Sequence, residues 1–143
     1  SVAEGDAFHP EANVATMSAG TPLTDADRWP WLDRIVTWTS VEAAAGRETL
    51  VTCSALRRAY RDRHRETPGR TIFVHLTGTP ELLEERMGAR VGHFMPPALL
   101  TSQLATLEPL QDDEDGIVVS IAPSTAEIVA EIIARLSLVP ASA

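Results

Sequence analysis

Short apolar runs alternate with longer segments of helical periodicity along the chain. An apolar start predicts a short buried strand ending at residues 4–6, and runs rich in β-branched and other apolar residues predict strands at 49–53, 71–76 and 117–121. Segments with apolar residues three and four apart predict helices at about 13–19, 25–45, 56–65, 80–90, 98–107 and 125–136. Strands that alternate with helices and are joined by short loops indicate an α/β fold with a parallel sheet.

Capping residues mark where several of these helices begin. Thr24 followed by Asp27 resembles a capping box, as does Ser124 followed by Glu127, and Thr79 precedes a proline at the first helical position. Glycines at positions 20 and 46 suit helix ends. The helix from about 25 to 45 carries one apolar stripe, made of Leu32, Ile35, Val36, Thr39 and Ala43.

Charge and cysteine content narrow the class of protein. The 143 residues carry a formal net charge of −8, which argues against a general nucleic-acid or anionic-membrane binder, because such binding needs clustered Lys and Arg. One cysteine, Cys53, excludes an internal disulfide framework and fits a reducing compartment. No apolar run approaches the roughly 20 residues that span a bilayer. We therefore expect a cytoplasmic protein with a small-molecule partner.

Polar side chains are expected to meet at the carboxyl ends of the strands, where parallel α/β sheets bind ligands. Asp6 and Ser54 each follow a strand, and Glu4 and Asp6 would point to the same side of theirs. A carboxylate there could accept a proton from a substrate hydroxyl or hold Mg²⁺ through water. His9, Arg28 and the face carrying Arg61 could hold a substrate carboxylate.

Each of these residues also has a structural interpretation. Residues 5–32 could be a solvated loop, His9 a loop cap, and the arginines of the 56–65 helix a solvated face. No second His or Cys stands at ligand spacing from His9, so a metal site built from side chains is not expected. Arg86, Arg90 and His93 could close over phosphates as part of a lid, or the arginines could pair with nearby glutamates.

Three groups of residues carry a resemblance that extends over nearly the whole chain. They are Gly5-Asp6-x-x-His9-Pro10-x-x-Asn13, continuing through Met17, Gly20, Pro22-Leu23, Asp25, Asp27-Arg28 and Pro30-Trp31-Leu32; Cys53-Ser54-Ala55-Leu56-Arg57 with Tyr60-Arg61-Asp62; and Gly92-His93-Phe94-Met95 with Gln103 and Leu107-Glu108. Together they resemble the gluconokinase family of small P-loop kinases.

The resemblance implies a three-layer αβα fold of the nucleoside-monophosphate-kinase type, with a parallel sheet and a helical lid at about 84–107. It implies ATP-dependent phosphorylation of D-gluconate to 6-phosphogluconate, with Mg²⁺, by a homodimer. Asp6 would be the base or orienting carboxylate. His9, Arg28 and Arg61, with Ser54, would be candidates for the substrate, and Arg86 and Arg90, with His93, would belong to the lid that faces ATP.

Two positions depart from the family pattern. Thr16 stands where the family has Lys, and no G-x-x-x-x-G-K-[ST] run occurs in the sequence. We therefore expect residues 1–143 to form a single kinase domain without its first strand and P-loop, as part of a longer polypeptide. The alternatives are a kinase of a related sugar acid, and a non-catalytic sugar-acid-binding or interaction domain that has lost the P-loop.

Overall fold

The computed structural model describes residues 1–89 and 98–138, which divide into two compact units. Described residues of the first unit are 1–71 and 98–109, and those of the second are 72–89 and 110–138. The elements of the first unit are β1 (Val2–Glu4), the 3-10 helix η1 (Gly5–Phe8), α1 (Glu11–Ser18), α2 (Asp25–Ala44), β2 (Leu50–Thr52), α3 (Arg58–His64) and α5 (Ala98–Thr106). Those of the second are β3 (Phe73–Thr77), α4 (Pro80–Gly88), β4 (Gly116–Ser120) and α6 (Thr125–Leu136).

A parallel strand pair anchors the first unit. β1 runs alongside β2, with Val2 opposite Leu50 and Glu4 opposite Thr52. The chain then turns into η1 at Gly5, where an added Cβ would lie 2.2 Å from the Thr52 carbonyl oxygen. Only glycine therefore lets η1 leave the strand this close to β2.

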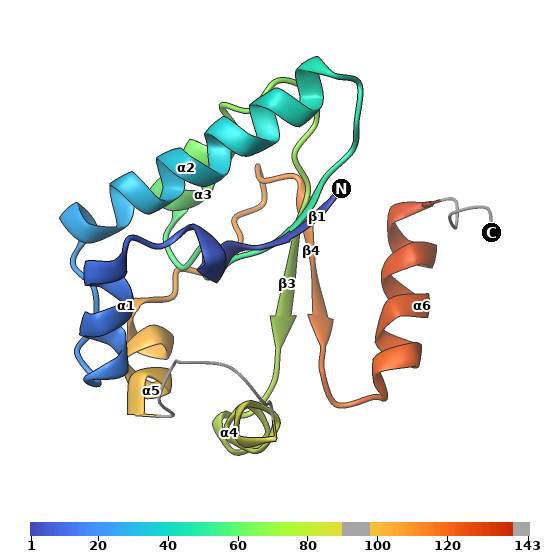
Figure 1. Cartoon of the computed structure of the whole chain (residues 1–143). Helices are drawn as coiled ribbons and strands as arrows, with labels where there is room; N and C mark the ends of the chain where they lie inside the picture. The colour runs from blue at the N-terminus through green and yellow to red at the C-terminus, as the bar shows by residue number, and fades with distance from the viewer. Residues whose placement is uncertain (90–97, 139–143) are drawn as a thin grey trace. The chain divides into compact units, whose positions relative to one another are not determined.

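The core of the first unit forms where α2 lies beside α3, as Figure 1 shows. Trp31, Leu32 and Ile35 of α2 are buried with Tyr60 of α3, which confirms most of the predicted apolar stripe. The Trp31 indole N–H donates to the Gly5 carbonyl at 2.7 Å and so fastens η1 to α2. At the start of α2, Thr24 and Asp27 form the predicted capping box.

The second unit contains a parallel pair with a helix along it. β3 pairs with β4 from Phe73 opposite Gly116 to Thr77 opposite Ser120. α6 follows β4 and lies alongside it (Figure 1), and Arg135 donates to the Val118 carbonyl at 2.7 Å. Thr79 and Ser124 accept backbone N–H groups at the starts of α4 and α6, as predicted for N-caps. The Glu127 carboxylate accepts from the Ser124 hydroxyl group, so the second half of the predicted capping box is replaced by a side-chain contact.

Two expectations about the strands are wrong. β1 ends at Glu4 and is not buried, with Val2 74% exposed, so Asp6 lies in η1 and does not share a strand face with Glu4. The hydrogen bond from Trp31 to Gly5 holds the chain in this turn instead of an extended strand. The nearly continuous apolar run at 71–76 is typical of a strand covered on both faces of a sheet, whereas Leu76 is 49% exposed.

The predicted fold class is confirmed, because the strands pair in parallel and alternate with helices. The lid expected at 84–107 includes the end of α4, residues 90–97, which are outside the described residues, and α5. It stays a prediction. Within 1–89 and 98–138, no helix combines the length and apolar character needed to cross a membrane.

Candidate functional site

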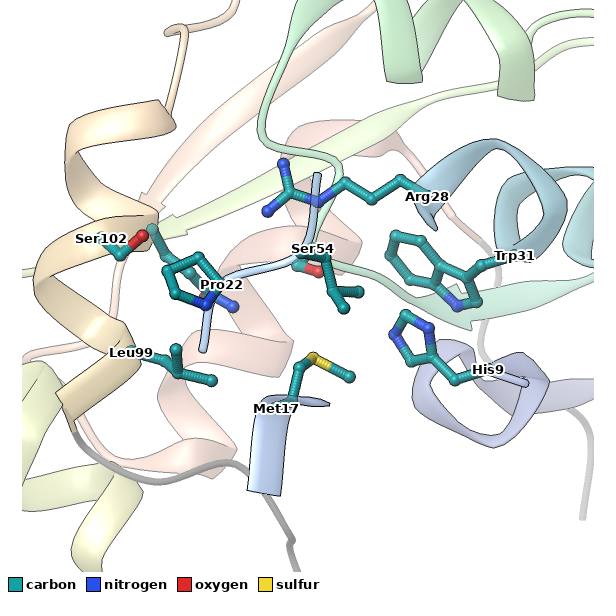
Figure 2. A pocket seen from close by; sticks show the side chains of 10 residues that line it. His9, Met17, Pro22, Arg28, Trp31, Ser54, Leu99 and Ser102 are labelled. Carbon is teal, nitrogen blue, oxygen red and sulfur yellow. The ribbon is translucent and has the colours of Figure 1, made fainter. Parts of the chain in front are cut away.

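A hollow in the first unit brings together three of the predicted site residues. It is partly open to solvent and is lined by His9, Met17, Pro22, Leu23, Arg28, Trp31, Ser54, Leu99, Ser102 and Gln103. His9, Arg28 and Ser54 were expected at a substrate site, and they come from three separate segments of the chain (Figure 2).

His9 forms one wall of the hollow. Its ring stacks on the Trp31 indole, with the ring centroids 4.3 Å apart and the planes 15° from parallel (Figure 2). Burial, together with the positive charge of Arg28, lowers the pKa of His9 to about 4. The imidazole is therefore neutral near pH 7.

Asp6 lies next to His9 in η1. Its Oδ1 atom is 3.9 Å from His9 Nε2, and its side chain is about one third exposed. Asp6 is not one of the residues that line the hollow, but it adjoins the hollow through His9. A half-exposed carboxylate beside a neutral imidazole can accept a proton from a bound hydroxyl group.

Arg28 supplies positive charge to the hollow. Its Nη1 donates to the Tyr60 hydroxyl at 2.7 Å, and its guanidinium carbon lies 5.3 Å from the centre of the Tyr60 ring. The Tyr60 hydroxyl donates in turn to Asp25. Burial and the Asp25 carboxylate raise the pKa of Tyr60, so this hydroxyl stays protonated. These contacts hold the guanidinium where it can bind an anion.

Arg61 has a different position from the one predicted. It is only 3% exposed and is not among the lining residues of the hollow. Its guanidinium donates to the carbonyl of Ala55 at 3.1 Å, that of Glu108 at 2.9 Å and that of Pro109 at 3.2 Å. These hydrogen bonds connect the loop after β2 with the segment after α5.

Of the three predicted lid residues, Arg86 alone lies within the described part of the chain, and it is not one of the residues that line the hollow. Arg86 is half-buried on α4, in the second unit. Arg90 and His93 lie outside the described residues. The proposed contact of these three residues with ATP stays a prediction.

Sequence reasoning missed the contribution of α5 to the hollow. Ser102 and Gln103 line it, and Leu99 is buried with Met17 and Leu23 beside it. A signal was present, because Gln103 is a polar residue within a stripe of leucines. Thr16, where the family pattern has Lys, donates to the Ala12 carbonyl of its own helix and is not a lining residue.

The described residues offer no cluster of metal ligands. Among them, no three His, Cys, Asp or Glu side chains gather in a way that could hold a metal ion. Cys53 packs against the core, with its Sγ 3.4 Å from His64 Nε2, and burial raises the pKa of its thiol to about 12. A thiol with this pKa is not a nucleophile near neutral pH.

The hollow combines one cation, several hydroxyl or amide groups and a flat aromatic wall. Arg28 can bind a carboxylate, and Ser54, Ser102 and Gln103 can exchange hydrogen bonds with hydroxyl groups. The stacked pair of His9 and Trp31 borders the hollow and can offer carbon atoms to a ligand. This arrangement suits a small anion that carries several hydroxyl groups.

Comparison with known proteins finds close relatives. No protein-family model matches the chain. The chain is 51% identical to a gluconokinase of Gluconobacter oxydans over 117 residues, which cover 82% of this chain and 66% of that protein. It is 39% identical to a probable gluconokinase of Xenopus tropicalis over 144 residues, which cover 90% of this chain and 76% of that protein.

A solved structure supports the fold. The crystal structure of a sugar kinase from Janibacter sp. HTCC2649 matches with a TM-score of 0.90 and 49% identity, covering 97% of this chain and 80% of that one. The chain thus spans about two thirds to four fifths of the length of these proteins.

Proposed function

The chain belongs to the gluconokinase family, and from this premise we propose that the protein transfers a phosphoryl group from ATP to D-gluconate, giving 6-phosphogluconate. The observation that carries the proposal is the hollow of the first unit. It places Arg28 among hydroxyl and amide side chains, and gluconate is an anion with a hydroxyl group on each of its other carbons.

On this proposal, Arg28 binds the gluconate carboxylate. The guanidinium is held by Tyr60 and by the Tyr60 ring face, so little side-chain entropy is lost when the substrate binds. Ser54, Ser102 and Gln103 pair with the hydroxyl groups of the chain of carbons. The Trp31 and His9 walls exclude water from one side.

Asp6 is the proposed general base. Its carboxylate takes the proton from the reacting hydroxyl group while the oxygen forms a bond to the γ-phosphorus of ATP, and ADP leaves with the electrons of the broken P–O bond. The neutral His9 beside it adds no positive charge next to the Asp6 carboxylate, and such a charge would weaken the carboxylate as a base.

ATP is proposed as the donor from the family alone. The 143 residues contain no G-x-x-x-x-G-K-[ST] run, and among the described residues no three His, Cys, Asp or Glu side chains gather as metal ligands, so we assign no step to the metal ion. Arg86, Arg90 and His93 are proposed to approach the phosphates from a lid at about 84–107. A cytoplasmic location and a homodimer are further proposals that rest on the resemblance to the family.

The test is gluconate-dependent release of ADP by the natural full-length protein. We expect turnover with gluconate and ATP and much less with other sugar acids or with shikimate. Turnover with a different sugar acid alone would reassign the substrate. Binding of gluconate without any ADP release would support the non-catalytic alternative.

Replacement of Asp6 tests the chemical step. We predict that Asp6→Asn lowers kcat for gluconate by about 10²-fold or more, because a positioned base contributes at least that much. Asp33→Asn is the matched control, since Asp33 is exposed on α2 and pairs with Arg63 away from the hollow. An unchanged kcat in Asp6→Asn would remove Asp6 from the chemistry.

A further inference from the structure

Asn13 of α1 is a buried polar residue that the proposed reaction does not yet use. It is only 6% exposed. Its side-chain nitrogen, Nδ2, is 2.9 Å from the carbonyl oxygen of Asp27 in α2 and 3.3 Å from Nδ1 of His9. One amide group therefore contacts both the first turn of α2 and the imidazole in the wall of the hollow.

The contact with Asp27 fixes the direction of the hydrogen bonds. A backbone carbonyl only accepts hydrogen bonds, so the atom that faces it must be the NH₂ group of the Asn13 amide and not its oxygen. The second hydrogen of this NH₂ group is left for His9. Nδ1 of His9 must then be the acceptor, and the single proton of the neutral ring resides on Nε2.

The protonated nitrogen is the one that faces the proposed base. Nε2 lies 3.9 Å from Asp6 Oδ1. We propose that Asn13 is a positioning residue that fixes His9 as its Nε2–H tautomer and so presents a neutral N–H donor, not a cation, to the Asp6 carboxylate. The effect on catalysis rests on the proposed function, whereas the tautomer itself does not.

Burial and the positive charge of Arg28 favour the neutral ring. Among the described residues, Asp6 of η1 and Arg28 of α2 bring charge near the ring, and the Asp6 carboxylate would by itself favour the protonated form. The Trp31 indole covers one ring face. Protonation of Nδ1 would set its new hydrogen against the NH₂ group of Asn13. A cationic His9 would also stabilise the ionised form of Asp6 and weaken it as a base.

The direct test is the protonation state of His9, measured by ¹⁵N NMR of the imidazole in the natural protein at pH 7. His9→Gln identifies the signals among the four histidines of the chain. We expect Nε2 to carry the proton and Nδ1 to be unprotonated. A proton on Nδ1, or a mixture of the two tautomers, would overturn the proposal even if the protein is an active gluconokinase.

The variant Asn13→Asp reverses the polarity of the contact with almost the same shape. A carboxylate accepts a hydrogen bond, so Nδ1 should become protonated and the pKa of His9 should rise. Ala12→Asp is the matched control, because it adds the same charge to an exposed position of α1.

The kinetic outcome separates positioning from a general structural role. In Asn13→Asp, kcat for gluconate near pH 6.5 should fall by about tenfold or more and recover at higher pH as His9 loses its added proton, with a smaller change in KM. A pH-independent loss would overturn the role in positioning, and so would an unchanged His9 tautomer in the folded variant. Absence of any turnover in the unsubstituted protein would contradict the proposed function, while the NMR result would still decide the tautomer.

Discussion

Two histidines of the first unit are kept neutral by their surroundings. Burial lowers the pKa of His9 to about 4, with help from Arg28, and burial lowers the pKa of His64 to about 4, with help from Arg63 and Arg65. The unfolded chain would bind protons at both positions near pH 6.5, whereas the folded chain does not bind them until about pH 4. Between pH 6.5 and about pH 4, the folded chain therefore binds fewer protons at these two histidines than the unfolded chain does.

Stability should consequently fall on acidification. Above pH 6.5 both states are neutral at these sites and stability is at its full value. Between pH 6.5 and 4 the unfolded state holds more protons, so each histidine removes up to about 1.4 kcal/mol per pH unit. Urea unfolding at pH 7.5 and pH 5 measures this, and His64→Gln should reduce the slope. Equal stability at both pH values would contradict the neutral state of the two rings.

The structure requires glycine at position 5. A Cβ there would lie 2.2 Å from the Thr52 carbonyl oxygen, which belongs to a paired strand and cannot move away easily. We predict that Gly5→Ala lowers the free energy of unfolding by about 2–3 kcal/mol. Gly88→Ala is the control, because a Cβ at Gly88 meets no atom within 4 Å and stability should be unchanged or slightly higher. Equal behaviour of the two variants would refute the close approach.

At the scale of elements, α5 is fastened at its carboxyl end to the start of α3. The Glu108 carboxylate accepts the backbone N–H of Arg58 at 2.7 Å, and the Glu108 N–H donates to the Leu56 carbonyl at 2.7 Å. The Arg61 guanidinium also donates to the Ala55 carbonyl in the loop before α3 and to the Glu108 and Pro109 carbonyls after α5. These bonds place α5 so that Ser102 and Gln103 reach the hollow.

Removal of the Arg61 guanidinium should therefore act on stability first. Arg61→Met leaves buried carbonyls without donors, each at a cost of about 1–3 kcal/mol, so we predict a loss of about 2–4 kcal/mol. Arg63→Met, which removes a partly exposed arginine of the same helix, should cost less than about 1 kcal/mol. Thermal unfolding compares the two variants. A normal melting temperature with a raised KM for gluconate would instead support a substrate contact for Arg61.

Elements with local signals were predictable from the sequence. The start of α2 follows from the capping pair Thr24 and Asp27, and those of α4 and α6 from Thr79 and Ser124, because these caps form within a single turn. The end of β1 was not predictable, since it depends on the hydrogen bond between Trp31 and Gly5, residues 26 positions apart. Because the sequence does not reveal this distant contact, the predicted strand continued to Asp6.

The candidate site was predictable only in part. The prediction identified His9, Arg28 and Ser54 because they lie near predicted helix and strand ends. All three line the hollow. The inward position of Gln103 and the carbonyl contacts of Arg61 depend on how α5 meets α3, which periodicity does not specify. Arginines on a short helix look alike in sequence, whether they are exposed or buried.

At the scale of the whole molecule, the candidate substrate site belongs to one of the two units. Every described residue that lines the hollow is in the first unit, although the segments of that unit are interrupted in sequence by residues of the second unit. We therefore predict that side chains of the first unit recognise the sugar acid. Substitutions in the hollow should affect gluconate and not ATP.

The most direct measurement is the pair of KM values for gluconate and ATP in an Arg28→Met variant of the full-length protein. Loss of a charged hydrogen bond to the carboxylate should raise KM for gluconate by about 10- to 100-fold. KM for ATP should be unchanged, and Arg34→Met, an exposed change on the same helix, should alter neither value. An unchanged KM for gluconate, or an equal rise in both KM values, would contradict the assignment of this hollow to the sugar acid.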